Sequence, residues 1–189
     1  MGKCAKEVLY MEYFDINIAG CDRKLPICAL NEKISIAAFV MFGDVEITEK
    51  SAEMLLQKSP EFDVILTAEA KSIPLAYEMS KQSGKQYVVA RKDIKVYVIN
   101  PLTVDVKTIT TRKNQQLHLS QENVETLKGK RVLIVDDVIS TGKSLIALEK
   151  LCELSQATVV AKCAVLAEGD AVNRDDIIYL EKLPIISND

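Results

Sequence analysis

The stretch that decides the fold is Val132–Ser144, which reads VLIVDDVISTGKS. It opens with four apolar residues, Val132–Val135, a run that predicts a short buried strand. Asp136 and Asp137 follow directly, and then come small residues and Gly142. Small residues let backbone N–H groups converge on an anion, and the helix expected next adds the positive end of its dipole. The stretch therefore predicts a phosphate-binding loop with two carboxylates at its entrance.

A nucleotide-binding P-loop is one alternative, because Gly142, Lys143 and Ser144 match the end of that motif. The P-loop also requires a glycine five residues before Gly142, and Asp137 stands there instead. A carboxylate would repel a phosphate, but it can accept hydrogen bonds from the 2- and 3-hydroxyls of a ribose. A helix N-cap with two chance acids is the other alternative, and the complete pattern argues against it. We therefore expect a ribose beside the phosphate.

Apolar runs alternate with helical patterns along the chain. Strands are predicted at Asp63–Thr67, Tyr87–Ala90, Arg131–Val135 and Thr158–Leu166, and helices at Ser72–Ser83 and Lys143–Leu154. Such alternation implies an α/β fold, with a mainly parallel twisted sheet and helices on both of its faces. Ligands bind beyond the carboxyl ends of the strands in these sheets. The loops after Thr67, Ala90 and Val135 all qualify, and all carry charge.

The segment Val104–Leu119 alternates in places around a polar centre, Thr110–Gln116. This pattern predicts a hairpin arm with a mobile tip, which could close over a neighbouring site and exclude water. His118, the single histidine, is expected on the surface of this arm. A lone histidine leaves little material for a histidine-based triad or a zinc site.

Composition limits the protein class. The 189 residues suit one domain, and 48% hydrophobic with 27% charged residues is typical of a soluble globular protein. A net charge of −3 argues against a general nucleic-acid binder, and no apolar run is long enough to span a membrane. Five cysteines without a CxxC pair favour reduced thiols in a cytoplasm, with Cys152 and Cys163 as packing residues. Met1–Met11 lacks the apolar stretch of a secretory signal.

Four segments carry a resemblance to a known family. Val132–Ser144 resembles the motif by which type I phosphoribosyltransferases bind 5-phosphoribosyl diphosphate (PRPP). Glu69–Ser72 resembles the pyrophosphate loop of adenine phosphoribosyltransferases, and Val88–Lys92 resembles the basic strand end of the adenine and xanthine enzymes. Leu25–Asn31 looks like the start of the base-covering hood of the xanthine branch. The likeness covers Leu25 to Asp170, and it indicates the purine branch.

The resemblance implies the type I phosphoribosyltransferase fold in one domain, residues 1–189, with a flexible β-arm at about 100–120. A small hood would come largely from residues 20–45 and 165–189. The implied reaction moves 5-phosphoribose from PRPP to a purine, giving a nucleoside monophosphate and pyrophosphate in purine salvage. The implied cofactor is Mg²⁺, bound mainly through PRPP rather than by protein alone. A cytoplasmic homodimer is expected, with PRPP and a purine base as its small-molecule substrates.

The resemblance also assigns residues. Asp136 and Asp137 would be catalytic, supporting the ribose as positive charge develops on it. The loop for the 5-phosphate would comprise Val138, Ile139, Ser140, Thr141, Gly142, Lys143 and Ser144. Pyrophosphate would be bound by Glu69, Ala70, Lys71, Ser72, Arg91, Lys92, Lys95 and Arg112. The chain departs from the family twice: Ser72 replaces a usual glycine, and Thr110–Arg112 lacks the glutamate that adenine enzymes carry in the arm.

Two segments of the sequence bear on which purine is bound. Leu25 and Asn31 match the hood residues that contact the base in the xanthine branch. That branch has a lysine after the last strand, where this chain has Glu168 and Asp170. Acidic side chains accept hydrogen bonds and suit an amino group, which favours adenine over xanthine; hypoxanthine and guanine stay open.

A non-catalytic PRPP sensor is the alternative function, as in purine repressors that resemble this fold. The segment before Leu25 is too short for a winged helix and has no strong basic face, which argues against it. A pyrimidine or orotate enzyme is a weaker alternative, because the hood and the Glu69–Ser72 loop fit purines better.

Overall fold

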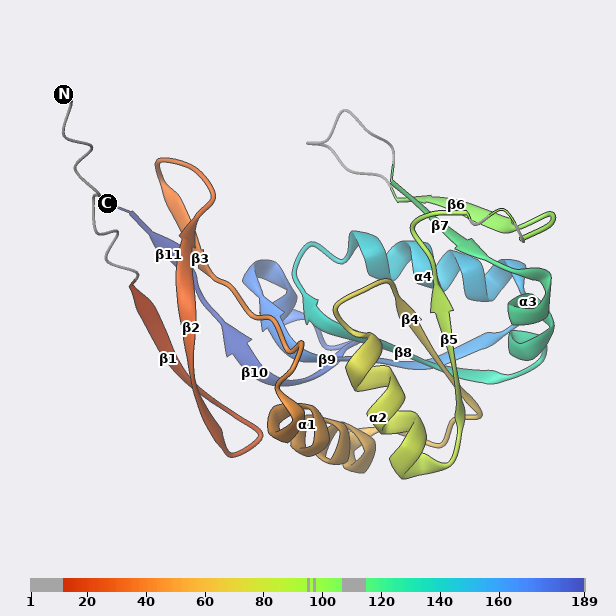
Figure 1. Cartoon of the computed structure of the whole chain (residues 1–189), viewed down its shortest axis with the longest axis horizontal. Helices are drawn as coiled ribbons and strands as arrows, with labels where there is room; N and C mark the ends of the chain where they lie inside the picture. Colours follow the sequence, from red (N-terminus) through yellow and green to blue (C-terminus); the bar gives the residue numbers. More distant parts are fainter. Residues whose placement is uncertain (1–11, 95, 97, 107–114, 189) are drawn as a thin grey trace, which may run out of the picture.

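The main sheet has five strands, all parallel (Figure 1). In spatial order they are β10 (Ile178–Leu183), β9 (Thr158–Glu168), β8 (Arg131–Ile139), β4 (Val64–Ala68) and β5 (Gln86–Ala90). The computed structural model describes residues 12–94, 96, 98–106 and 115–188. Every strand predicted for this sheet is present, and the predicted parallel α/β arrangement is confirmed.

Helices cover both faces of this sheet (Figure 1). One face packs against α1 (Val45–Lys58) and α2 (Ile73–Ser83), and the other against α3 (Gln121–Leu127) and α4 (Lys143–Leu154). Side chains of a strand alternate between the two faces. Accordingly, Leu66 and Ile134 are buried with α4, whereas Ile65 and Leu133 are buried with α1 and α2. The unbroken apolar runs of β4 and β8 follow from burial on both faces.

The chain reverses its direction of travel between β4 and β8. From β4 it passes through α2 to β5 on one side, and from β8 it passes through α4 to β9 on the other. Crossovers between parallel strands are right-handed, so outward steps in opposite directions place α2 and α4 on opposite faces. A crevice opens beyond the carboxyl ends of the two strands at such a reversal. The fold thus places a binding crevice beside the ends of β4 and β8.

The two acids lie within β8 rather than after it. Val135 is the last β8 residue that pairs with β4, through Thr67. Asp136, Val138 and Ile139 continue to pair with β9 alone. The predicted end of the strand at Val135 was therefore too early, because β9 supplies partners that β4 no longer does. The β8 edge that β4 leaves open faces the loop after β4.

A second, antiparallel sheet lies at one end of the molecule (Figure 1). Its strands, in spatial order, are β1 (Tyr13–Ile18), β2 (Cys21–Ala29), β3 (Ile34–Ala37) and β11 (Ile185–Ser187). These residues fall within or close to the ranges expected for a hood. β10 also falls within those ranges, yet it belongs to the main sheet. The assignment of this sheet as a hood is part of the proposal below.

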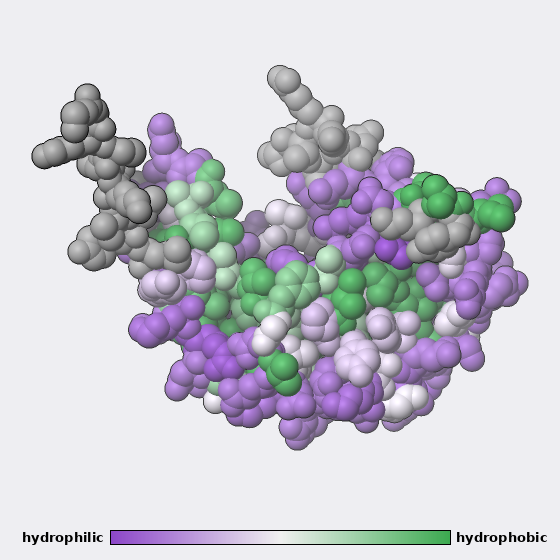
Figure 2. All heavy atoms as spheres, viewed as in Figure 1, coloured by the Kyte–Doolittle hydropathy of each residue, from purple (hydrophilic) through white to green (hydrophobic). Residues whose placement is uncertain are grey.

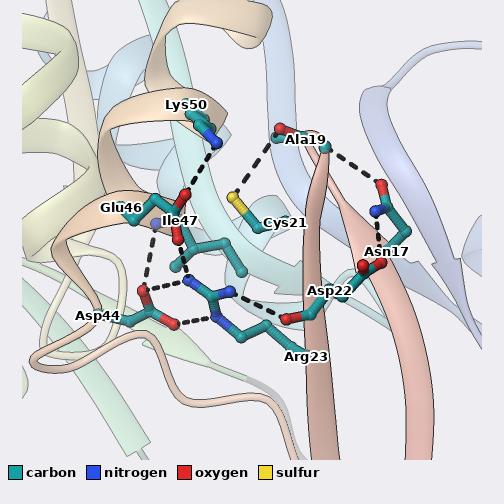
Figure 3. Close-up of polar contacts among 10 residues, drawn as sticks. Asn17, Ala19, Cys21, Asp22, Arg23, Asp44, Glu46, Ile47 and Lys50 are labelled. Carbon is teal, nitrogen blue, oxygen red and sulfur yellow. Dashed lines mark hydrogen bonds and ion pairs between the residues drawn. The ribbon is translucent and has the colours of Figure 1, made fainter.

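Arg23 of β2 joins the second sheet to α1 (Figure 3). Its Nε lies 2.6 Å from Oδ2 of Asp44, and its Nη2 lies 2.9 Å from both Oδ1 of Asp44 and Oε2 of Glu46. Asp44 is the N-cap of α1, where its side chain also accepts the N–H of Ile47. Glu46 in turn contacts Lys50, 2.9 Å away. The guanidinium is therefore held by two carboxylates at the positive end of a helix, which fixes how the sheet meets α1.

The predicted arm is present as β6 (Leu102–Val106) and β7 (Gln115–Leu119), which pair antiparallel. Its predicted tip falls on residues 107–114, which lie outside the described residues. β7 also pairs with the end of β5, since the backbones of His118 and Arg91 exchange hydrogen bonds of 2.8 and 2.9 Å. His118 is only 6% exposed, and its Nδ1 lies 2.9 Å from Oγ1 of Thr103. The expectation of a surface histidine was wrong, because pairing on both edges of β7 encloses the residue.

Three of the four described cysteines are packing residues. Cys152 and Cys163 are buried in the core, as predicted, and Cys21 is buried too. Cys28 is exposed, and each of these four is a free thiol. Burial raises the pKa of the Cys152 and Cys163 thiols to about 12. Within the described ranges, no helix has the length and apolarity to cross a membrane.

Candidate active site

A pocket of about 200 Å³ lies at the carboxyl ends of β4 and β8. It is enclosed by the loop after β4, by the arm with the end of β5, and by the end of β8. Its lining comprises Ala68, Glu69, Ala70, Lys71, Ser72, Lys92, Val106, Gln115, Gln116, Leu117, Asp136, Asp137, Val138 and Ser144. The fold thus brings together the predicted pyrophosphate loop and the predicted catalytic pair, which lie far apart in sequence. Gln115 and Gln116 of β7 also line the pocket; the sequence placed them in the polar centre of the arm but assigned neither a role of its own.

Asp136 and Asp137 form a crowded pair of carboxyl groups. Asp137 is 4% exposed, and its backbone N–H donates to Oδ1 of Asp136 over 3.0 Å. Burial raises the pKa of Asp136 first, and the neighbouring charge of Asp137 raises it further. Two acids in one partly buried site favour any ligand that brings positive charge or hydroxyl donors. The pair is therefore suited to a sugar that carries hydroxyls and becomes cationic.

Lys71 already supplies one such positive charge. Its Nζ lies 2.6 Å from Oδ2 of Asp137, and its side chain is half exposed. The lysine comes from the loop after β4 and the aspartate from β8, so their ion pair spans the crevice. Lys71 also lines the solvent-accessible pocket. Lys71 can therefore hold an incoming anion while it still balances the buried acid.

Two hydroxyl groups fasten the loop after β4. Oγ1 of Thr67 lies 2.8 Å from the Val135 carbonyl and 2.7 Å from Oγ of Ser72, which lies 3.2 Å from the Ala68 carbonyl. Ser72 is the N-cap of α2 with φ −85° and is 1% exposed. That backbone angle suits any residue, so this position does not require the glycine usual in the resembling family. The Glu69–Ala70 peptide bond in this loop is cis.

Glu69 connects this loop to the end of β5. Its Oε2 accepts the backbone N–H of Lys92 over 3.0 Å, and its Oε1 lies 3.7 Å from Nη2 of Arg91. Lys92 lines the pocket, so the pocket has a second exposed cation besides Lys71. Lys95 and Arg112, the other cations predicted for pyrophosphate, lie outside the described residues.

The predicted phosphate loop encloses a smaller hollow of about 50 Å³ beside the main pocket. Asp136, Val138, Leu145 and residues 139–144 line it. Gly142 is the N-cap of α4 with φ +70°, a left-handed conformation that glycine adopts without strain. The first N–H groups of α4 have no partner within the helix and can receive an anion. The geometry of the loop is compatible with its predicted binding of a phosphate group.

Arg174 is a residue near this loop that the sequence did not reveal. Its Nη1 lies 2.6 Å from the point where a Cβ on Gly142 would stand. The two residues belong to different connections of the sheet, and no motif links them, so no sequence signal was available.

The residues predicted to bind the base are more scattered. Leu25 is 6% exposed within the core cluster of α1 and α2. Asn31 is exposed, and its Oδ1 accepts the N–H groups of Lys33 and Ile34, so it shapes its own turn. Neither lines the main pocket. The roles of Leu25 and Asn31 as base contacts therefore stay predictions.

The acids after β9 differ in exposure. Glu168 is half-buried at the end of the strand, and burial raises the pKa of its carboxyl group while the charge of Lys71 lowers it. Asp170 is exposed in the following 3₁₀ turn, η1 (Gly169–Asn173). Neither acid lines the main pocket, and the roles of Glu168 and Asp170 as base contacts stay predictions.

Comparison with known proteins agrees with this geometry. The phosphoribosyl transferase domain matches residues 44–185 of the chain. A hypoxanthine/guanine phosphoribosyltransferase of Methanococcus voltae is 40% identical over 132 residues, which are 67% of each chain. The purine biosynthesis transcriptional repressor PurR of Bacillus subtilis is 30% identical over 113 residues, which are 60% of this chain and 39% of the repressor.

Solved structures give the same class. The adenine phosphoribosyltransferase of Thermoanaerobacter pseudethanolicus is 26% identical with a TM-score of 0.65, over 75% of this chain and 84% of that one. Fold, pocket and relatives define a PRPP-binding α/β protein of the purine type. The chain belongs to the phosphoribosyltransferase family, type I, in its purine branch.

Proposed function

We propose that the protein transfers the 5-phosphoribosyl group of PRPP to a purine base, releasing pyrophosphate, as a step of purine salvage. The observation that carries this proposal is the ion pair between Lys71 and Asp137, 2.6 Å apart, in the crevice between β4 and β8. It sets a cation for pyrophosphate beside an acid for ribose, next to a loop for the 5-phosphate. These are the three parts of PRPP, in the order in which the molecule connects them.

The residues divide the chemistry among themselves. Asp136 and Asp137 accept hydrogen bonds from the ribose hydroxyls and stabilise the positive charge that grows on the ribose as the bond to pyrophosphate breaks. Lys71 and Lys92 bind the leaving pyrophosphate. The N–H groups that begin α4, with the hydroxyls of residues 140, 141 and 144, hold the 5-phosphate. The purine nitrogen then attacks C1 of the ribose from the hood side.

The donor set fits Mg²⁺ bound mainly through its substrate. Within the described part of the chain, no three His, Cys, Asp or Glu side chains gather as a metal site. Asp136 and Asp137 line the pocket, and Mg²⁺ prefers carboxylates, phosphates and water as ligands. When bound with PRPP, the ion would supply charge neutralisation for the leaving group.

The choice of base has two candidates. Hypoxanthine and guanine are favoured by the relatives that carry those names, including the 40% identical one. Adenine is favoured by Glu168, whose carboxylate suits an amino group, and by the similarity to adenine enzymes of known structure. Guanine satisfies both observations, since it carries an amino group and belongs to the first set.

A PRPP-sensing regulator is the alternative, supported by the similarity to a purine repressor. A regulator would bind PRPP without consuming it. The two functions therefore separate by product formation, and not by PRPP binding.

We also propose a homodimer in a reducing cytoplasm. Val40, Phe42, Val45 and Tyr77 are each more than half exposed, and Figure 2 shows apolar surface near the middle of this face, where the chain passes from β3 to α1. Apolar surface of this kind suits burial against a second copy. The four described free cysteines suit a reducing compartment.

The testing experiment incubates the protein with PRPP, Mg²⁺ and, separately, adenine, hypoxanthine, guanine and xanthine. Separation of the products by chromatography is expected to reveal a nucleoside monophosphate with at least one base. The preferred base then identifies the enzyme. Binding of PRPP with no product from any base would support the regulator instead.

A further inference from the structure

Arg174 approaches the phosphate loop from a separate part of the sheet. It follows η1 in the connection from β9 to β10, where its backbone N–H donates to the Ala171 carbonyl over 3.2 Å. Its guanidinium extends to Gly142, with Nη1 2.6 Å from the position of an added Cβ. Arg174 does not line the small hollow. Its charge would therefore act across Gly142, which has no side chain to intervene.

A set of ion pairs fixes the direction of this guanidinium. Nε and Nη2 donate to the two oxygens of Asp176, over 2.8 and 2.6 Å. Asp176 also accepts from Lys162 over 2.5 Å, and Lys162 reaches Glu149 of α4 over 2.8 Å. Both hydrogen bonds to Asp176 come from Nε and Nη2, on the side of the guanidinium away from Nη1. Within the described residues, Nη1 itself makes no hydrogen bond. The remaining donor is thus directed at the loop.

The positive and negative side chains of this set are equal in number, so Arg174 belongs to a balanced cluster and is not an isolated surface cation. Two cations, Arg174 and Lys162, meet two anions, Asp176 and Glu149. The carboxylate of Asp176 nevertheless lies on the far side of the guanidinium from Gly142. An anion in the loop would therefore meet the positive end of an oriented pair, in a partly buried site where such a field is weakly screened.

We propose that Arg174 is a positioning residue of the 5-phosphate site, which strengthens the hold of the loop on a phosphate monoester through the gap left by Gly142. The proposal rests on the proposed function, because it needs the loop to bind the 5-phosphate of PRPP. It adds a residue outside the Val132–Ser144 stretch to that site. It also gives Gly142 a second reason to be glycine, since a side chain there would displace the guanidinium.

The test measures binding of two probes by calorimetry at low salt. Ribose 5-phosphate carries only the monoester, and inorganic pyrophosphate carries only the leaving group. Replacing Arg174→Met should weaken the binding of ribose 5-phosphate on the order of 10-fold, because one nearby charge is lost. The salt dependence of that binding should also decrease. Pyrophosphate should bind as before. Arg174→Lys, which keeps the charge, should recover part of the affinity.

Arg131→Met is the matched control. Arg131 makes the same bidentate pair, with Asp63, at the opposite end of β8. Its loss should leave both probes unaffected, so any general effect of deleting such a pair is accounted for.

The outcomes separate the two proposals. If Arg174→Met weakens the binding of both probes equally, or does not weaken the binding of ribose 5-phosphate, the role of Arg174 is overturned. Either result leaves the proposed function standing. A wild-type protein that binds neither ribose 5-phosphate nor pyrophosphate would overturn the proposed function and this inference together.

Discussion

Lys71 and Asp137 are the two residues that join the halves of the site, with Nζ of the lysine 2.6 Å from Oδ2 of the aspartate. They are far apart in sequence, and they meet because β4 ends opposite Val135 while β8 continues along β9. The pairing leaves the carboxylates of β8 open to the loop after β4. The distance between these two side chains therefore reports directly on how the sheet builds the pocket.

Replacing Lys71→Met should weaken PRPP binding. The side chain keeps its length but loses the charge that we assign to pyrophosphate, and one charge-assisted contact should account for a rise in the KM for PRPP of about 10- to 100-fold. Steady-state kinetics with PRPP varied at saturating base measures this. Lys128→Met is the control, since Lys128 is similarly exposed at the C-cap of α3 and does not line the pocket. Equal KM values in the wild type and Lys71→Met would remove Lys71 from the site.

Most of the main sheet could be predicted from local patterns. The helix Lys143–Leu154 was predicted with its observed bounds, because its apolar spacing and the glycine before it are both local signals. The loop before this helix was predicted from the same local signals, and its phosphate-binding role stays a prediction. The end of β8 was not, because its last residues are strand only by virtue of their pairing with β9.

The remaining parts depend on contacts between distant segments. Arg174 stands against Gly142 only after β9 and the turn behind it have been placed. His118 is buried because the end of β5 pairs with its strand, although the alternation of β7 alone suggested a surface position. Leu25 was predicted to contact the base from a resemblance; its side chain packs in the core, and the contact stays a prediction. Sequence patterns report the period of an element, but not which other element will cover it.

Replacing Glu168→Gln should change the preference among bases. The carboxylate accepts with both oxygens, whereas the amide offers one acceptor and one donor group, so bases with an exocyclic amino group lose most. We expect kcat/KM for adenine or guanine to fall about 10-fold relative to hypoxanthine. Asp170→Asn, in the exposed turn, should change this ratio little. A parallel loss for all bases would contradict a role of Glu168 in recognising the amino group.

Replacing Arg23→Met should loosen the attachment of the second sheet. Arg23 is 26% exposed and contacts both Asp44 and Glu46, so its loss should lower the Tm by roughly 2–4 °C. Hydrogen exchange should become faster in β1–β3 and stay unchanged in β8. Lys24→Met is the control, because the Lys24–Asp15 pair is more than 70% exposed on both sides and should contribute close to nothing. Unchanged exchange in β1–β3 would show that apolar packing alone holds the sheet.

The acidic pair should make stability depend on pH. The pKa of Asp136 is raised in the folded protein, by burial and by the charge of Asp137, so ionisation of Asp136 costs folding free energy. The folded protein is therefore more stable at low pH, where the carboxyl group is protonated, and it loses this stability as the pH rises through the raised pKa. The Tm gained by the double variant Asp136→Asn with Asp137→Asn should therefore be larger at about pH 8 than at about pH 5. A gain that does not grow with pH would contradict the assigned crowding of the two carboxylates.

The same double variant gives the most direct test of the central claim, which is that Asp136 and Asp137 support the ribose of PRPP during transfer. Release of pyrophosphate from PRPP should be followed for wild type and variant, with Mg²⁺ and the preferred purine. We predict that the variant folds at least as well as the wild type and turns over at least about 10³-fold more slowly, because the site can no longer stabilise positive charge on the ribose. Turnover by the folded variant at a rate near that of the wild type would contradict the account.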